Sequence, residues 1–267
     1  LKSFVKSINL PFKQNIEIIL SPENNKLPVF LINANTDFAA VISKNSILDK
    51  TKAGFVGEIF VLYCESIGIS TCWVGAFRKK QAYNIIFPES GKISSNNNYQ
   101  ANFFKETETH YQKEILCLIA LGYKSGGRSL INNLINKLYS SKRRSIEETL
   151  DKDSITDFPE YIREALELAS RAPSARNRQY WYFKVIKNSH FNKDIQILKA
   201  GRIEQEKKYI VQIGRRANQS SFGWPHPDLD IGICASHFWI ALENMNIKNI
   251  INIKIAEDGS ALWEFLF

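Results

Sequence analysis

Two segments of this chain repeat one apolar pattern, and the repeat restricts the fold more than any other feature. AGFVGEIFVLYCESIGI (53–69) aligns with DIGICASHFWIALENMNI (230–247) at a constant offset of 178 residues, so that Gly54 meets Gly232. Each segment is apolar on nearly every face, which predicts a helix buried on all sides. The alternative is a chance alignment, because short periodic segments resemble one another.

The repeat suggests that the chain consists of two related halves, 1–141 and 142–267. We expect them to pack like the subunits of a dimer and to form one compact unit. Small residues at equivalent positions, Gly57 and Ala235, would let the two buried helices approach each other closely.

Helical and strand signals alternate along the chain. Short apolar or aromatic runs predict buried strands at 27–33, 115–121 and 181–186. Asp157 as N-cap and a glutamate three residues later predict a helix start, and Pro173 is expected to stop that helix. A rigid turn at 224–227 is predicted to precede a second helix that starts at Asp230.

Composition excludes several classes of protein. With 44% apolar and 12% aromatic residues the chain is not intrinsically disordered, and no apolar run reaches the ~18 residues that a membrane span needs. The net charge of +8 suits a phosphorylated cofactor, but no nucleic-acid-binding module is recognisable. The cysteines form no CxxC pair and indicate a reduced, cytoplasmic protein: Cys64, Cys72, Cys117 and Cys234.

The densest group of polar side chains is RAPSARNRQ (171–179), between the predicted helix and the aromatic strand. Pro173 stiffens the turn, and Ser174 and Asn177 offer a hydroxyl and an amide on a short loop. These groups suit the edge of a heterocycle or a polyol, because an amide both donates and accepts. The alternative is an ordinary polar connection.

Four motifs resemble the FMN-dependent nitroreductase superfamily. ALELASRAPSARNRQYWYFKVI (165–186) resembles its loop-and-strand segment, and KRRSI (142–146) resembles its opening motif, although Glu147 stands where a second Arg is usual. IGISTCWVGAF (67–77) is similar to the loop after the family's central helix. DIGICASHFWIALE (230–243) resembles the partner helix of the fused branch, in which two halves share one polypeptide.

The resemblance implies an α+β, nitroreductase-like fold, built as an intramolecular pseudo-dimer with a central mixed or antiparallel sheet and two buried helices. It implies one FMN site between the halves, because only one complementary set of motifs is present. The first half would supply Thr71, Cys72, Trp73, Val74 and Gly75, with Arg143 and Arg144 at its end. The second half would supply Pro173, Ser174, Ala175 and Asn177.

The activity implied is transfer of hydride from NAD(P)H to FMN and then of electrons to a nitroaromatic, a quinone or a related small-molecule acceptor. Hydride transfer needs no side-chain acid or base, so no catalytic residue and no metal are expected. We expect a monomer without nucleic-acid or membrane partners. Because the chain begins at Leu1, we expect the natural N-terminus, and a further phosphate-binding Arg, to lie upstream.

The expected roles follow from elementary chemistry. A guanidinium fork on Arg143 or Arg144 suits the FMN phosphate. Hydrogen-bond donors on Ser174 or Asn177 would stabilise the negative charge of the reduced flavin and raise its potential. Gly75 would allow the backbone to approach the ring closely.

Other signals have simpler interpretations. GYKSGGRS (122–129) lacks the Lys of a phosphate-binding P-loop and is interpreted as a strand ending in a loop. Cys72 is interpreted as a small packing residue and His237 as a core or interface histidine. Arg215 and Arg216 are interpreted as a solvated face, with an NAD(P)H phosphate contact as the alternative.

Two other functional classes stay open. A flavin-binding protein that stores or senses flavin would bind FMN without oxidising NAD(P)H. A basic nucleic-acid-binding protein would be colourless and would show a steep dependence of affinity on salt.

Overall fold

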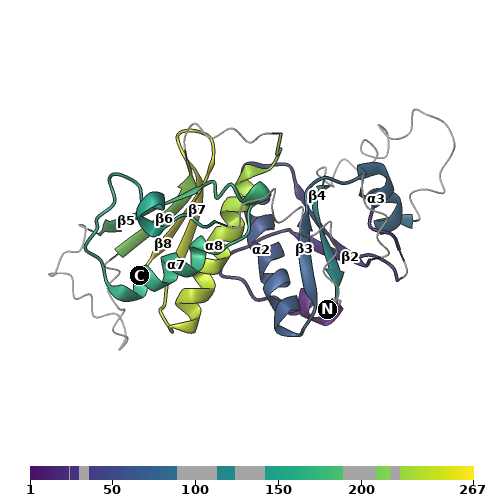
Figure 1. The fold of residues 1–267 in the computed structure, drawn as a ribbon, viewed down its shortest axis with the longest axis horizontal. Coiled ribbons are helices and arrows are strands. Elements are labelled where there is room, and N and C mark those ends of the chain that lie inside the picture. The colour runs from purple at the N-terminus through teal and green to yellow at the C-terminus, as the bar shows by residue number, and fades with distance from the viewer. Residues whose placement is uncertain (24, 30–35, 89–112, 124–141, 189–208, 217–222) are drawn as a thin grey trace. The chain divides into compact units, whose positions relative to one another are not determined.

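The computed structural model describes residues 1–23, 25–29, 36–88, 113–123, 142–188, 209–216 and 223–267. The chain divides into two compact units, Leu1–Lys137 and Leu138–Phe267 (Figure 1). The described elements of unit 1 are α1 (Lys2–Ser7), β1 (Glu17–Leu20), β2 (Phe38–Lys44), α2 (Ile47–Ser66), β3 (Ser70–Val74), α3 (Lys79–Ile86) and β4 (Lys113–Gly122). Those of unit 2 are α6 (Ile146–Thr149), α7 (Glu160–Ser170), the 3-10 turn η2 (Ala175–Asn177), β5 (Trp181–Lys187), β6 (Tyr209–Arg215), α8 (Pro227–Asn244), β7 (Ile250–Ile255) and β8 (Ala261–Leu266).

The two units share one topology. Their strand orders, β1-β2-β4-β3 and β5-β6-β8-β7, follow the same sequence of first, second, fourth and third strand. Every pairing between these strands is antiparallel. The two repeated apolar segments occupy equivalent places, because α2 joins the second strand to the third in unit 1 and α8 does so in unit 2. The α+β class with two related halves is therefore confirmed, with one antiparallel sheet in each unit.

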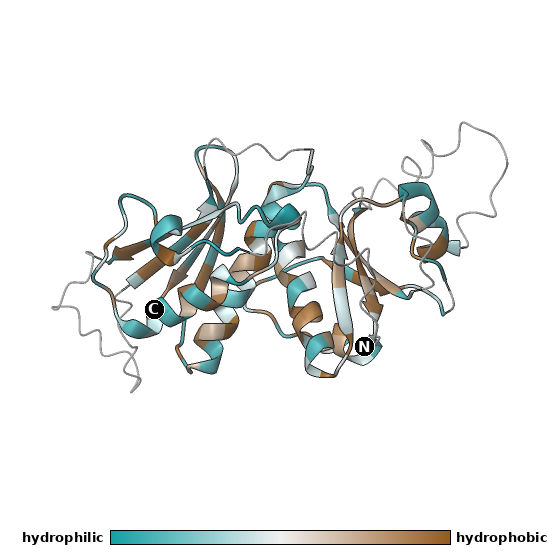
Figure 2. Cartoon of the chain, viewed as in Figure 1, coloured by the Kyte–Doolittle hydropathy of each residue, from teal (hydrophilic) through white to brown (hydrophobic). Residues whose placement is uncertain are grey.

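Both repeated helices are buried around much of their circumference, as predicted. The middle turns of α2 and α8 are predominantly apolar (Figure 2). Ser46 caps α2 by accepting the N–H of Asp49 at 3.1 Å, and Gly68 takes a positive φ of 79° just after the helix ends. None of the helices in the described ranges is long and apolar enough to cross a membrane.

Strand β2, inside the sheet of unit 1, is buried on both faces. The side chains of β2 are buried from Phe38 to Ile42, and alternate residues point to opposite faces. On one face lies α2. On the other, Phe38, Ala40 and Ile42 join Ala82 and Ile86 of α3 in one apolar cluster.

The sheet of unit 2 has one buried and one partly exposed face. Trp181, Phe183 and Val185 of β5 are fully buried, whereas the residues between them are not. Helix α8 packs on this sheet and α7 packs on α8. The strict alternation in β5 is what the aromatic run 181–186 predicted for a strand with one face in the core.

Several boundaries differ from the predictions. Helix α7 begins at Glu160 with Pro159, not Asp157, at the N-cap position, and it ends at Ser170, three residues before Pro173. Helix α8 begins at Pro227, not at Asp230, since proline is well suited to the first turn. These differences arise because caps depend on backbone geometry that sequence patterns fix only to within a few residues.

Two predicted segments fall partly outside the described residues. The strand predicted at 27–33 is wrong for its described part, because residues 27–29 are irregular, and 30–33 lie outside the described ranges. The strand predicted at 115–121 is confirmed as β4. Of the segment 122–129 that follows it, residues 124–129 lie outside the described ranges.

Candidate functional site

The loop between α7 and β5 is closed by its own hydrogen bonds. Ser174 accepts the N–H of Gln179 on its hydroxyl oxygen at 2.9 Å and the N–H of Asn177 on its carbonyl at 2.9 Å. The N–H of Arg178 reaches the carbonyl of Ala175 at 3.1 Å. These bonds fold the motif into the single turn η2 and fix where its side chains stand.

Three residues of this loop adopt the left-handed backbone region. Arg176 and Asn177 have φ of 53° and Gln179 has φ of 51°. Residues other than glycine seldom adopt this region, and such conformations persist only where the surroundings over-determine them. Strain of this kind clusters at binding sites, which makes the loop a candidate site on conformational grounds alone.

The side chain of Gln179 clamps the loop to the basic segment 142–144. Its Oε1 accepts the N–H of Arg144 at 2.8 Å, and its Nε2 donates to the carbonyl of Lys142 at 3.0 Å. Gln179 is only 3% exposed, so both backbone groups find their partner in a buried amide. The clamp joins two segments that lie 37 residues apart in the chain.

Together with the Gln179 clamp, the hydrogen bonds of Arg143 and Asn177 form a frame that joins the loop to the segment 142–144. The Nη1 of Arg143 donates to the carbonyl of Ala172 at 2.8 Å and to Asn177 Oδ1 at 3.0 Å. The Nδ2 of Asn177 donates to the carbonyl of Lys142 at 3.1 Å. Both ends of the Asn177 amide therefore serve to join the loop to the basic segment, a role that spacing in the sequence did not indicate.

The surface formed by the segment 142–144 and the loop 171–179 is rich in positive charge. Arg143 is exposed and Arg144 is half-buried, and the loop itself adds three exposed guanidinium groups: Arg171, Arg176 and Arg178. Ser145, directly after the basic pair, caps α6 through a reciprocal capping box with Glu148. An anion placed beside Arg143 would meet charge and donors held by a rigid frame.

The resemblance assigned Arg143 and Arg144 to the half that carries the TCWVG segment, and this assignment is wrong. Both arginines lie in unit 2 and are bonded to the loop of that same unit. The reason is the Gln179 clamp, a contact between residues far apart in the chain that no local sequence pattern predicts.

A buried carboxyl group on α8 accepts a hydrogen bond from the backbone of the loop. Asp230, in the first turn of α8, accepts the N–H of Ala175 on Oδ2 at 3.1 Å and is 2% exposed. Burial raises the pKa of Asp230 to about 8, with a smaller contribution from Asp228 in the same direction, while the Ala175 N–H acts to lower it. Asp230 was predicted only as a helix start.

The other expected residues lie in unit 1. Thr71, Cys72, Trp73 and Val74 form most of strand β3, and Gly75 follows it, so the segment predicted as a loop is mainly a strand. Strand β3 pairs with β4 and stands at one end of the strand order. The five residues are consecutive and belong to unit 1, whereas the loop 173–179 belongs to unit 2.

Two side chains of β3 have surroundings that the sequence did not indicate. Trp73 donates from Nε1 to the buried carboxyl of Glu58 at 2.8 Å, and its ring occupies the space beside Gly57. The small residue at 57 therefore admits an indole ring. Cys72 is exposed and is not a packing residue, because it alternates with Trp73 to the opposite face of the strand.

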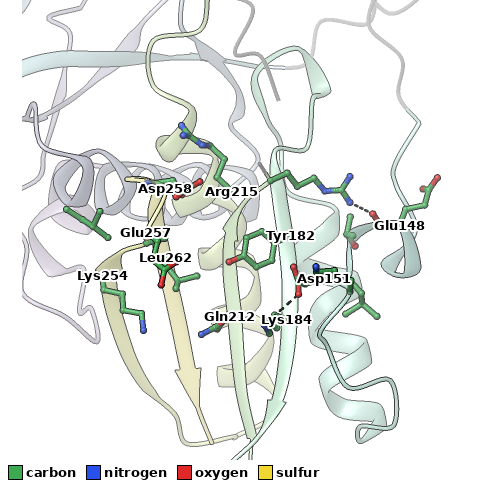
Figure 3. Close-up of a pocket in the computed structure, with 17 residues that line it drawn as sticks. Glu148, Asp151, Tyr182, Lys184, Gln212, Arg215, Lys254, Glu257, Asp258 and Leu262 are labelled. Carbon is green, nitrogen blue, oxygen red and sulfur yellow. Dashed lines mark hydrogen bonds and ion pairs between the residues drawn. The ribbon is translucent and has the colours of Figure 1, made fainter. Parts of the chain in front are cut away.

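A groove of about 940 Å³ lies on the outer face of the sheet in unit 2 (Figure 3). Tyr182 and Leu262 form part of its floor. Its charges are largely paired: Lys184 lies 3.7 Å from Asp151, and Lys254 lies 2.9 Å from Glu264 beside it. None of the residues predicted to bind FMN lines this groove.

Arg215 and Arg216 border the groove and are half-buried, so they are only partly solvated. Arg215 lies 3.8 Å from a carboxyl oxygen of Asp228. Arg216 donates to the carbonyls of Trp181, at 3.0 Å, and Glu148. His237 is half-buried on α8, and in the part of the chain that the structure describes no group of three or more His, Cys, Asp or Glu side chains could hold a metal ion.

The chain is thus a duplicated α+β protein with a strained, arginine-lined loop directly after α7. The chain belongs to the family described as "Putative TM nitroreductase", whose model matches residues 1–93 and 96–242. This membership supports a general oxidoreductase role.

Among solved structures, the chain is similar to a putative nitroreductase from Thermotoga maritima. The two are 17% identical, the match covers 99% of this chain and 82% of the other, and the TM-score is 0.53, so the likeness is one of fold. No curated protein matches the chain significantly.

Proposed function

We propose that the protein is an FMN-dependent oxidoreductase that takes hydride from NAD(P)H and reduces a nitroaromatic, a quinone or a related small acceptor. The observation that supports this most strongly is the frame around Arg143, whose Nη1 binds both Ala172 and Asn177. It fixes an exposed guanidinium group beside the loop that resembles the flavin-binding loop of the superfamily.

The donor set of this frame fits a phosphorylated flavin. Arg143 and Arg144 would hold the phosphate, since a guanidinium group binds it through paired, charge-assisted hydrogen bonds. Pro173, Ser174 and Ala175 would contact the ring system through a turn whose conformation is already set. Asn177 would act mainly by holding Arg143 in place.

We propose the segment in unit 1 as a second set of contacts to FMN: Thr71, Cys72, Trp73, Val74 and Gly75. Gly75 is exposed at the end of β3, where the lack of a side chain leaves its backbone accessible. The Trp73–Glu58 hydrogen bond holds the strand to α2 two residues before that glycine.

When bound, FMN would supply N5 as the acceptor of hydride from NAD(P)H and would return two electrons to the acceptor. The chain would contribute binding, orientation and a positive field. Positive charge and hydrogen-bond donors near the ring system would favour the reduced, negatively charged flavin over the oxidised form, which would raise the redox potential.

The first test is the absorption spectrum of the purified full chain after incubation with FMN and gel filtration. We expect a yellow protein that releases one FMN per chain on denaturation and that oxidises NADH or NADPH when a nitroaromatic or a quinone is added. A colourless protein would refute the proposal. Bound FMN without oxidation of either nucleotide with any acceptor would instead favour a storage or sensing role.

A further inference from the structure

The buried carboxyl group of Asp230 and the loop 173–179 meet at one backbone amide. Asp230 belongs to α8 and Ala175 begins the turn η2, and they lie 55 residues apart in the chain. The hydrogen bond from Ala175 N to Asp230 Oδ2 is 3.1 Å long. It ties the helix that carries Asp230 to the first residue of the strained turn.

We propose that Asp230 is a positioning residue of the FMN site: by accepting the N–H of Ala175 it holds the turn 174–177 in the conformation that binds flavin. This proposal rests on the proposed function and adds a positioning residue to that same site.

The turn needs such support because its backbone is strained. Arg176 and Asn177 follow Ala175 directly, and both adopt positive φ. A segment of this kind returns to ordinary backbone angles unless its neighbours hold it. Gln179 and Arg143 hold its C-terminal side, whereas Asp230 holds the N-terminal side through Ala175.

Asp228, the other acid in the first turn of α8, makes different contacts. Asp228 accepts the N–H of Ala261 on Oδ1 at 2.8 Å, and its Oδ2 lies 3.8 Å from Arg215 of β6. Asp228 therefore joins α8 to the sheet, while Asp230 joins α8 to the loop. Two acids in one helical turn thus provide a test residue and a matched control.

Among the residues that the structure describes, the surroundings of Asp230 offer little to neutralise its charge. The residues that α7 buries carry no titratable group: Ile162, Ala165, Leu166, Ala169 and Ser170. On α8, Asp228 is an acid, and burial holds the pKa of Cys234 well above its usual range, so that thiol stays neutral. Burial raises the pKa of Tyr180, which directly precedes β5. The charge of Asp230 also acts to raise this pKa, whereas Arg178 and Arg176 act to lower it.

Because burial raises the pKa of Asp230 to about 8, neutral and charged forms are both present near that pH. A charged acceptor forms a hydrogen bond roughly twice as strong as a neutral one. We therefore expect oxidised FMN and riboflavin to bind about fivefold more tightly as the pH rises through this pKa.

The experiment compares wild type with Asp230→Asn and Asp230→Ala. Affinity for FMN and riboflavin is measured by flavin fluorescence from about pH 6 to about pH 10, on either side of the Asp230 pKa. Asp230→Asn keeps the acceptor but cannot titrate, so its affinity should not change across this range and should equal that of wild type at low pH. Asp230→Ala should also lose the pH dependence, and it should bind both flavins about twofold more weakly than wild type at low pH and about tenfold more weakly at high pH, because the amide loses its partner.

Asp228→Asn is the control, since it removes a carboxylate from the same turn of α8 without touching the loop. It should retain a pH dependence of the same size as wild type, with the midpoint moved to lower pH, because Asp228 contributes to the raised pKa of Asp230. Hydrogen exchange of the Ala175 amide gives a readout that needs no flavin: protection should fall in Asp230→Ala and remain in Asp230→Asn and Asp228→Asn.

Absence of FMN binding by wild type, with Ala175 protection still dependent on Asp230, would refute the proposed function and the flavin part of this proposal, but not the positioning of the loop. Tight FMN binding whose pH dependence persists in Asp230→Asn would overturn the role of Asp230 and leave the proposed function intact. Unchanged Ala175 protection in Asp230→Ala would overturn the positioning role directly.

Discussion

The indole ring of Trp73 lies so close to Gly57 that a β-carbon at position 57 would stand 2.4 Å from Trp73 Cη2. A glycine in the middle of a helix costs about 1 kcal/mol relative to alanine, so its presence in α2 calls for a reason. The reason is the ring, which crosses α2 at this residue and reaches Glu58 through Nε1. The pair joins helix and strand in unit 1.

Gly57→Ala should therefore destabilise the protein by about 1–3 kcal/mol, because the added methyl group forces the ring or the helix to move. Urea unfolding measures this change. In a Trp73→Leu background the same substitution should cost much less, since the ring is gone. An equal cost in both backgrounds would show that the ring is not what excludes the methyl group.

Arg143→Gln should weaken FMN binding far more than riboflavin binding. A charge-assisted hydrogen bond to phosphate contributes about 1.5–3 kcal/mol, so FMN affinity should fall about tenfold to a hundredfold. Riboflavin has no phosphate and should respond only to the lost contacts with Ala172 and Asn177. Isothermal titration with both ligands separates these effects. An equal loss for both flavins would remove the phosphate role from Arg143.

Arg143→Lys is the matched variant, because it keeps the charge but not the fork. It should recover part of the FMN affinity lost in Arg143→Gln. Arg144→Gln is expected to weaken FMN binding in the same direction as Arg143→Gln, and to leave the Gln179 clamp intact, because that clamp uses the backbone N–H of Arg144.

Gln179→Leu should reduce the free energy of unfolding by about 1–3 kcal/mol, since the N–H of Arg144 would lose its buried partner, while the carbonyl of Lys142 would keep the bond from Asn177 Nδ2. Urea unfolding of the full chain provides the measurement. Gln212→Leu is the control: Gln212 bonds to Glu264 at 2.7 Å on the partly exposed face of the sheet, and its loss should cost less. A similar cost for the two variants would argue against the clamp.

Asp230 should make stability fall as pH rises. Its pKa is raised to about 8 in the folded protein, whereas an unfolded aspartate titrates near its ordinary value. Between those two values the folded state holds a proton that the unfolded state has released, so the contribution of this group declines by up to ~1.4 kcal/mol per pH unit.

Asp230→Asn removes that decline. The difference in unfolding free energy between variant and wild type should grow in favour of the variant from about pH 4 to about pH 8 and then level off. Urea unfolding at several pH values measures it, and other titrating groups cancel in the difference. A difference that does not change with pH would mean that Asp230 titrates at its ordinary pKa.

Much of the fold could be predicted because its signals are local. The apolar repeat at 53–69 and 230–247 indicated two equivalent helices, and α2 and α8 occupy equivalent places in two sheets of one topology. The alternation in 181–186 predicted β5 with one buried face. Such patterns are readable because the period of a helix or a strand is set within a few residues of the chain.

The polar loop 171–179 was also visible in the sequence, but its internal construction was not. Which side chain meets which backbone group depends on the path of the chain over tens of residues. The Gln179 clamp joins residues 37 apart, and the Asp230 contact joins residues 55 apart. No periodicity or spacing encodes contacts at such separations.

The sequence by itself determined the duplicated α+β architecture, the two buried helices and the position of the candidate loop, because each follows from the order of apolar and polar residues along a short stretch. Only the tertiary structure decided that Arg143 belongs with this loop, that Trp73 fills the space at Gly57, and that a buried Asp230 supports Ala175. The physical reason is that burial and hydrogen-bond partners are properties of the packed chain. A carboxyl group becomes a buried, proton-holding support only when the elements around it have excluded water.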